Sequence, residues 1–342
     1  MTAENSSNQA ETTRLTVSHQ MDGQRIDQTL ARAYPDYSRA YFQRGIKAGH
    51  VLLNDRPCRP ADKVSTNDVI TVTWPEDKPI ELHGEPIAFD VLWEDEDVIV
   101  LNKPPGLVVH PAKGNWEGTL VHALLAHDEE SFRKLVDEDL RPGIVHRLDK
   151  DTSGVMVVAK HERSRMALSR SFRERQVEKT YLAVTPGEFA RKQGTISAPI
   201  GRHPRDRKKM AVVGEKGKHA VTHYHVLAGS EEATLVEVRI ETGRTHQIRV
   251  HLASICHPVL GDPVYGGRQA RFPAHVPRQM LHAWKLAFPH PSTGKMNQYI
   301  GDLPADFQRV LIDLGLPVIG PDRKRRLAGH YGKEFQHDTH SH

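Results

Sequence analysis

A loop of acidic and basic residues at 146–154 is the strongest candidate for chemistry in this 342-residue chain. Its sequence is His-Arg-Leu-Asp-Lys-Asp-Thr-Ser-Gly, with a Pro-Gly pair before it and an apolar, β-branched run after it, which predicts a loop leading into a strand. Asp149 lies beside two bases, Arg147 and Lys150, that favour its charged form. Such a carboxylate can act as a nucleophile or a base. The ordinary alternative is a solvated, salt-bridged turn.

Two later stretches carry residues that could complete such a site. Tyr181 alternates with apolar neighbours in a predicted strand at 179–184, where a half-buried structural tyrosine is the ordinary interpretation. Residues 241–252 have the sequence Glu-Thr-Gly-Arg-Thr-His-Gln-Ile-Arg-Val-His-Leu, which predicts a glycine-ended strand followed by a helix. Arg249 lies beside the apolar face of that helix, and a partly buried cation needs a partner.

The elements that position these residues are predicted to form two domains, because the chain is long enough for two separate cores. We expect a disordered tail at 1–13, a small domain at 14–75, a Pro/Glu/Lys/Gly-rich linker at 76–86, a second domain at 87–318 and a basic, His-rich tail at 319–342. In the second domain, hairpin-connected strands with inserted helices predict an α+β fold with a mixed, mainly antiparallel sheet.

The composition excludes several classes of protein. No apolar run approaches the roughly 20 residues that span a membrane, and residues 1–13 lack the apolar core of a signal peptide. Two distant cysteines exclude a disulfide framework and a four-cysteine zinc site, so we expect a cytoplasmic protein without membrane contact.

The chain's 22 histidines raise the alternative of a metal-dependent hydrolase. However, His246 and His251 are five positions apart, not the four of a helical zinc pair, and no HExxH motif occurs. We therefore expect no functional metal.

Basic residues are concentrated in one turn-rich segment, although the formal net charge of the chain is only +4. Between 202 and 218, seven bases face two acids, and such a cluster can pair with phosphates or form an ordinary solvated loop. The bases that we assign to RNA contact in this segment are Arg202, Arg205, Lys208 and Lys209.

The order of elements in 14–75 resembles an S4 RNA-binding domain. A helix with Ile26 and Leu30 on one face is followed by a second helix from Arg39 to about Ala48, and then by two strands. The resemblance implies that Arg39, Arg44 and Lys47 of the second helix contact the RNA backbone.

The three candidate stretches resemble, in the same order, the motifs of the RluA-type pseudouridine synthases. This resemblance implies a curved, mainly antiparallel sheet with a central active-site cleft, and an isomerisation that needs no cofactor. Asp149 would be the catalytic residue, attacking C1′, attacking C6 or removing the C2′ proton of a uridine. Tyr181 would stack on the base and Arg249 would pair with Asp149.

Two further arginines take roles from the same resemblance. Arg147 would fill the gap left by the flipped base. Arg244 is the alternative partner for Asp149, and its turn position also suits a phosphate contact.

Within this family, the S4-like domain and the segments 35–39 and 202–204 resemble the members that modify large-subunit (23S) ribosomal RNA in the stem-loop called helix 69. The implied partner is that RNA or its precursor, with no nucleotide cofactor, and we expect a monomer. The alternative is a non-catalytic, S4-type RNA-binding ribosome assembly factor, and the presence of Asp149, Tyr181 and Arg249 argues against it.

Overall fold

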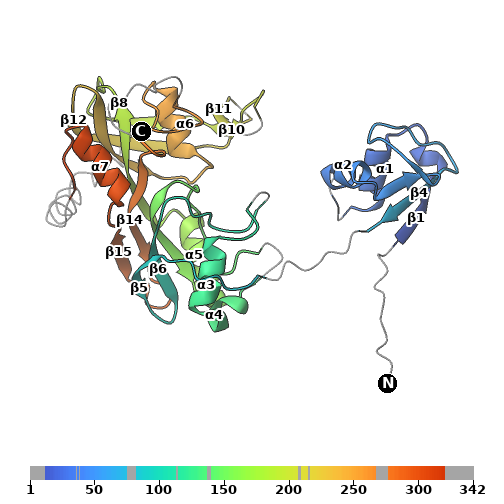
Figure 1. The fold of residues 1–342 in the computed structure, drawn as a ribbon, viewed down its shortest axis with the longest axis horizontal. Coiled ribbons are helices and arrows are strands. Elements are labelled where there is room, and N and C mark those ends of the chain that lie inside the picture. Colours follow the sequence, from blue (N-terminus) through green and yellow to red (C-terminus); the bar gives the residue numbers. More distant parts are fainter. Residues whose placement is uncertain are drawn as a thin grey trace, which may run out of the picture. The chain divides into compact units, whose positions relative to one another are not determined.

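The chain forms two compact units, Met1–Glu81 and Leu82–His342 (Figure 1). The computed structural model describes residues 12–35, 37, 39–74, 82–112, 115–136, 140–206, 209–214, 216–266 and 276–319, without the side chain of Ala40. Each unit has an apolar core of its own. The units are therefore considered separately.

The first unit packs two helices on a four-stranded antiparallel sheet with the strand order β1-β4-β2-β3. Ile26 and Leu30, one helical turn apart, are fully buried in its core together with Phe42 of the second helix. Its elements are β1 (Thr12–Thr16), the 3-10 helix η1 (His19–Met21), α1 (Ile26–Ala33), α2 (Arg39–Lys47), β2 (Val51–Leu53), β3 (Arg56–Pro57) and β4 (Val69–Thr73).

Two predicted boundaries of the units differ from the structure. Thr12 and Thr13 belong to β1, where they pair with β4, so this part of the predicted 1–13 tail is ordered. Leu82 is buried in the core of the second unit, and the carboxylate of Glu85 accepts a hydrogen bond from the Gly118 amide at 3.0 Å. The second unit thus begins at 82 rather than 87, because the buried side chain of Leu82 attaches this part of the chain to the core although the composition of 76–86 is polar. Residues 1–11, 75–81 and 320–342 lie outside the described residues.

The second unit is built on a nine-stranded sheet with the order β5-β6-β7-β14-β8-β13-β12-β9, and β15 pairs with β14. Its neighbouring strands are antiparallel except for β7 and β14. The predicted α+β fold with a mixed, mainly antiparallel sheet is therefore confirmed. The strands are β5 (Asp90–Glu94), β6 (Val98–Lys103), β7 (Ser153–Ala159), β8 (Glu178–Pro186), β9 (Gln193–Ser197), β12 (Val221–Gly229), β13 (Ala233–Ile240), β14 (Leu281–Pro289) and β15 (Met296–Ile300).

Helices and one separate hairpin complete this unit (Figure 1). They are α3 (Leu120–His127), α4 (Glu129–Arg133), α5 (Glu162–Arg173), the hairpin β10 (Ile200–Arg202) and β11 (Met210–Val212), α6 (Gln247–Ser254) and α7 (Ala305–Asp313). Successive residues of β8 point to opposite faces of the sheet and pack in different cores, as expected for a strand covered on both sides. Tyr181 packs in the core that contains α3 and α6, whereas Leu182 packs in the core that contains α7.

The start of β7 depends on a glycine. Gly154 has a φ of +123°, and a Cβ at this position would lie 2.2 Å from the carbonyl oxygen of Ala283 on β14. Only glycine lets the backbones of β7 and β14 approach this closely in their parallel pairing. The loop that ends in Gly154 therefore leaves the sheet at a fixed point, and this loop carries Asp149.

Candidate active site

The three candidate stretches meet at one cleft of about 110 Å³ in the second unit. The loop before β7 contributes Asp149, the strand β8 contributes Tyr181, and the segment before and within α6 contributes residues 243–249. Apolar side chains of Ile240 and Leu281 line the same cleft. The side chain of Asp149 is 23% exposed, so a ligand in the cleft can reach its carboxylate.

Arg249 links Asp149 to a second, fully buried carboxylate. Its Nη1 donates to Oδ2 of Asp149 at 2.8 Å, while Nε and Nη2 donate to Oδ2 and Oδ1 of Asp262 at 2.7 and 2.9 Å. Burial by itself would lower the pKa of Arg249, but the hydrogen bonds and charges of Asp262 and Asp149 raise it above its usual value. Burial would raise the pKa of Asp262, but its hydrogen bonds with Arg249 lower it. This row of alternating charges fixes Oδ2 of Asp149 and leaves Oδ1 for chemistry.

The predicted alternative partner, Arg244, has a different contact. Its Nε donates to the carbonyl oxygen of His219 at 3.1 Å, and the residue lines the cleft. The turn that carries it is held by Gln247, whose Oε1 accepts from the Arg244 amide and the Thr242 hydroxyl. The geometry thus favours Arg249 as the partner of Asp149 and leaves Arg244 at the cleft wall.

Tyr181 forms part of the cleft wall beside Asp149 and is 9% exposed. Burial, and to a smaller extent the charge of Asp149, raises the pKa of its hydroxyl above the usual value. Its ring and the apolar side chains of Ile240 and Leu281 offer surface on which a planar base can pack. The placement is compatible with the stacking role that the family resemblance implies.

Two buried side chains and one half-buried side chain hold the backbone of the Asp149 loop. Lys103, fully buried, donates from Nζ to the carbonyl oxygens of Pro104, Leu107 and Lys150 at 2.7, 2.9 and 3.0 Å. Arg278 donates to the carbonyl oxygen of Asp151 at 2.9 Å. His146 accepts from the Val157 amide at 3.1 Å and stacks on the ring of Phe172. The loop is therefore fastened on both sides of Asp149.

The pKa values of two of these groups depart from their ordinary values. Burial, followed by the nearby charge of Arg278, lowers the pKa of Lys103 to about 7. Burial, followed by the charge of Lys179, lowers the pKa of His146 to about 3, so this imidazole is neutral in the folded protein near pH 7.

Sequence reasoning missed four residues of this site: His246, Asp262, Tyr265 and Arg278. The turn after Leu260 supplies the second partner of Arg249, although its glycine-rich sequence is typical of a surface turn. The available signal was that a buried arginine needs acidic partners, but spacing alone does not say which acid approaches it.

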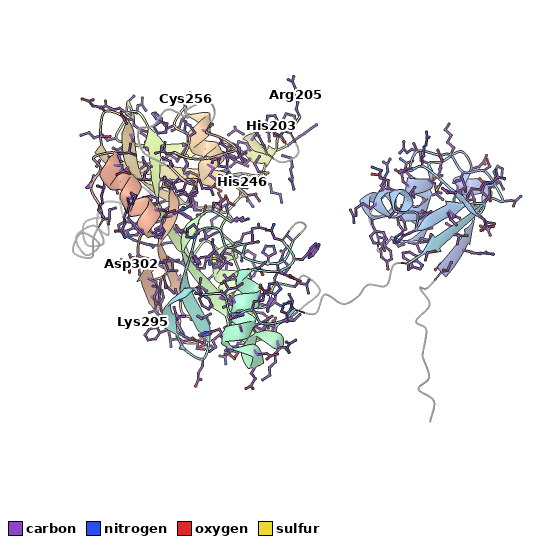
Figure 2. All side chains as sticks on the ribbon, viewed as in Figure 1. His203, Arg205, His246, Cys256, Lys295 and Asp302 are labelled. Atoms are coloured by element: carbon purple, nitrogen blue, oxygen red, sulfur yellow. The ribbon has the colours of Figure 1, made fainter. Side chains whose placement is uncertain are left out.

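The bases assigned to RNA contact are distributed over both units. Arg147 is exposed at the cleft, with Nη1 at 3.4 Å from Nε2 of His110. Arg202, Arg205 and Lys209 belong to the hairpin β10–β11 and its connection, whereas Lys208 lies outside the described residues. Figure 2 shows His203 and Arg205 at this hairpin, away from the sheet of the second unit.

In the first unit, α2 presents Arg44 and Lys47 as exposed side chains. Arg39 has a partner that the sequence did not indicate, because its Nε donates to Oδ2 of the buried Asp27 at 3.0 Å. Burial would raise the pKa of Asp27, but hydrogen bonds from Arg25, Gln43 and Arg39 lower it to about 2. Arg39 therefore ties α2 to α1, whether or not its 44% exposed side chain also contacts RNA.

Among the described residues, one group of His and acidic side chains is compact enough to hold a metal ion: Asp95, Asp97 and His290. It lies at the end of β6 away from Lys103. The Nδ1 atom of His290 faces the amides of Ser292 and Thr293, so the ring proton lies on Nε2 and points to Asp95 at 3.0 Å. Oδ1 of Asp95 already accepts from two backbone amides. The group is thus a satisfied hydrogen-bond network rather than a set of free metal ligands.

Comparison with known proteins identifies the family. Residues 97–254 match the model of the RNA pseudouridylate synthase family, and residues 24–70 match the S4 domain. "Ribosomal large subunit pseudouridine synthase D" of Neisseria meningitidis serogroup B is 44% identical over 311 residues, covering 88% of this chain and 82% of that protein. The chain belongs to the RNA pseudouridine synthase family. An uncharacterized member of this family, YlyB of Bacillus subtilis, is 42% identical over 88% of this chain and 97% of its own length.

Solved structures agree with this assignment to the pseudouridine synthase family. The human RNA pseudouridylate synthase domain containing 1 superposes with a TM-score of 0.54 at 26% identity, covering 71% of this chain and 96% of that chain. The family match includes Asp149, Tyr181 and Arg249, while Asp262 lies beyond it. In the part of the chain that the structure describes, no helix is both long and apolar enough to cross a membrane.

Proposed function

We propose that this protein converts specific uridines of large-subunit ribosomal RNA to pseudouridine, with the helix 69 stem-loop as its target. The observation that carries the proposal is the Asp149 carboxylate, held by the buried Arg249–Asp262 pair at a cleft walled by Tyr181. The names of the relatives from Neisseria meningitidis and Haemophilus influenzae, each a ribosomal large subunit pseudouridine synthase D, support the choice of RNA.

The reaction breaks the N1–C1′ bond of the uridine and forms a C5–C1′ bond. N1 gains a proton and C5 loses one, so the atoms balance without a group donor, an oxidant or a reductant. A carboxylate inside the cleft cannot reach the reacting atoms of a base that is stacked in a helix, so the uridine leaves its stack first. Arg147, exposed at the cleft, would occupy the gap in the RNA.

Asp149 provides the reactive carboxylate in this proposal. Since Arg249 binds Oδ2, the other oxygen, Oδ1, attacks C1′, attacks C6 or removes the C2′ proton. Arg249 keeps the carboxylate in one orientation, so little rearrangement is needed when the uridine arrives. Tyr181 packs against the base and is close enough to Asp149 for their electrostatic interaction to influence the pKa of Tyr181.

RNA binding is shared between the two units. Arg44 and Lys47 of the S4 domain and the basic hairpin of the second unit contact phosphates, which provide affinity and register with little sequence information. The register that these contacts set then decides which uridine reaches the cleft.

The proposal is tested with purified protein and large-subunit ribosomal RNA transcripts that carry tritium at C5 of uridine. Isomerisation releases tritium, because C5 exchanges its hydrogen for the bond to C1′. We expect release from the helix 69 stem-loop and from no matched stem-loop of other sequence. Tight binding without release from any transcript would contradict the proposal and favour the non-catalytic assembly factor.

A further inference from the structure

Tyr265 lies between the basic hairpin and the catalytic aspartate. Its hydroxyl accepts a hydrogen bond from the backbone amide of Met210 in β11 at 2.9 Å. The same hydroxyl lies 2.9 Å from Nδ1 of His246, which precedes α6. One phenol group therefore contacts the hairpin on one side and the cleft wall on the other.

These contacts connect the hairpin to His246. The Met210 amide can only donate, so the hydroxyl accepts from it, and the hydrogen of the hydroxyl is available for Nδ1 of His246. The other ring nitrogen, Nε2, lies 3.9 Å from Oδ1 of Asp149, beyond direct hydrogen-bond distance. Burial raises the pKa of Tyr265 and lowers that of His246, which keeps the hydroxyl protonated and the ring neutral near pH 7.

Tyr265 also supports the other oxygen of Asp149, through Arg249. The guanidinium of Arg249 lies over the Tyr265 ring, 5.1 Å from its centroid. The backbone amide of Tyr265 donates to Oδ1 of Asp262 at 3.0 Å, and Asp262 holds Arg249. The residue thus contacts Arg249, which binds Oδ2, and His246, which lies near Oδ1, without touching the carboxylate itself.

The hairpin on the other side of Tyr265 is a separate two-stranded sheet that carries bases. Arg202 pairs with Met210 across the hairpin, and Ile200 packs against Val250 of α6. A displacement of the hairpin by bound RNA would therefore change the position of Tyr265 through the Met210 amide, and the position of α6 through the apolar contact of Ile200 with Val250.

We propose that Tyr265 is a positioning residue that couples RNA engagement by the hairpin β10–β11 to the orientation of Asp149, through the path Met210, Tyr265 and His246. This inference rests on the proposed function, because it needs an RNA substrate that contacts the hairpin. When RNA holds the hairpin, the Met210 amide holds the Tyr265 hydroxyl, and the hydroxyl holds the His246 ring beside Oδ1 of Asp149. Without that restraint the imidazole is free to turn, and the surroundings of Oδ1 change.

The central variant is Tyr265→Phe, which keeps the ring over Arg249 and removes only the hydroxyl. We expect a single-turnover rate at saturating RNA about fivefold to tenfold lower than that of the wild type, as for the loss of one or two ordinary hydrogen bonds. RNA affinity and melting temperature should remain near the wild-type values. The matched control is Tyr224→Phe on β12, a ring that packs against Phe189 and lies outside the cleft residues, and its rate should not change.

Coupling is measured with a double-mutant cycle. The hairpin variant Arg205→Gln, Lys209→Gln should lower both affinity and the saturated rate in the wild-type background. In the Tyr265→Phe background it should lower affinity alone. A purely structural tyrosine would instead give rate effects that multiply, and that result would overturn the proposal.

The outcomes separate this proposal from the proposed function. If the wild-type protein releases no tritium, the function is wrong. If the wild type is active and Tyr265→Phe reacts at the same rate, the coupling is wrong and the function stands. Should Tyr265→Phe fail to fold, His246→Asn removes the same connection at a position with a φ of +55° that asparagine tolerates, and it must show the same rate loss and the same cycle.

Discussion

Substituting Asp262 by asparagine tests whether a buried charge pair holds Arg249 in place beside Asp149. The asparagine oxygen can still accept from the amides of Val264 and Tyr265, so the turn should persist. Oδ2 of Asp262 accepts from Nε of Arg249 at 2.7 Å, and this contact and the negative charge disappear. Arg249, with a side chain only 5% exposed, then keeps Asp149 as its one charged partner in the cleft.

The expected magnitude follows from the burial of this pair. Removing one partner of a buried ion pair costs about 3–5 kcal/mol, because the remaining charge is left without compensation. We expect Asp262→Asn to lower the unfolding free energy by about 3 kcal/mol, the lower end of this range, because the amide oxygen keeps part of the hydrogen-bond network. A misplaced Arg249 also lets Asp149 move, and displacement of about 1 Å can reduce a rate about a hundredfold.

In a Trp74→Phe background, the remaining tryptophans, including the buried Trp284, all belong to the second unit. Urea denaturation followed by tryptophan fluorescence then reports the stability of that unit, and tritium release reports the rate. The matched control is Glu162→Gln, which removes a carboxylate that also receives two hydrogen bonds from one arginine, Arg165, but on the surface. The control should change neither quantity measurably. Wild-type stability and turnover in Asp262→Asn, or equal losses in both variants, would refute the reasoning from burial.

Three further predictions concern RNA binding, metals and pH. Deleting residues 1–80 should weaken RNA binding, while turnover at saturating RNA persists. Each lost phosphate contact should remove about 0.7–0.9 from the slope of log affinity against log salt concentration, and an unchanged slope would contradict the role of the S4 domain. Activity should be complete in excess EDTA, and loss that zinc or magnesium restores, with the RNA fold controlled, would oppose the metal-free mechanism. His146→Gln should make the unfolding free energy less sensitive to acid, because glutamine takes up no proton as the pH falls. The folded pKa of His146, about 3, lies below its ordinary 6.5, so stability is lost as pH falls through this window. Between pH 6 and 4.5, the slopes of unfolding free energy against pH of the wild type and the variant should differ by an amount that approaches about 1.4 kcal/mol per pH unit. Parallel pH profiles would show that His146 is not buried as a neutral ring.

The sequence predicted those parts of the site whose residue types stand out within a short stretch of the chain. An aspartate between two bases, a tyrosine within a strand and an arginine beside an apolar helix face are visible in short windows, and all three line one cleft. Local periodicity indicated that Arg249 could be partly buried, but its choice over Arg244 as the partner of Asp149 came from the family resemblance. The mixed, mainly antiparallel sheet followed from hairpin spacing.

The parts that the sequence did not predict depend on long-range approach. Asp262 and Tyr265 belong to a Gly-rich turn whose letters fit a surface loop equally well, and only the fold brings that turn to Arg249. Arg39 shows the same limit, because a base at this position on α2 has the same helical pattern whether it faces water or the buried Asp27. Leu82 was assigned to the linker because composition does not show where a single apolar side chain is buried.

Replacement of Asp149 by asparagine is the most direct test of the central claim that this carboxylate performs the isomerisation. The amide has nearly the same shape and can still contact Arg249, so folding and RNA affinity should remain close to those of the wild type. An amide is neither the nucleophile nor the base that the reaction needs. We predict no tritium release from 5-tritiated helix 69 RNA above the level without enzyme. Turnover at the wild-type rate in Asp149→Asn would contradict the assignment of Asp149 as the catalytic residue.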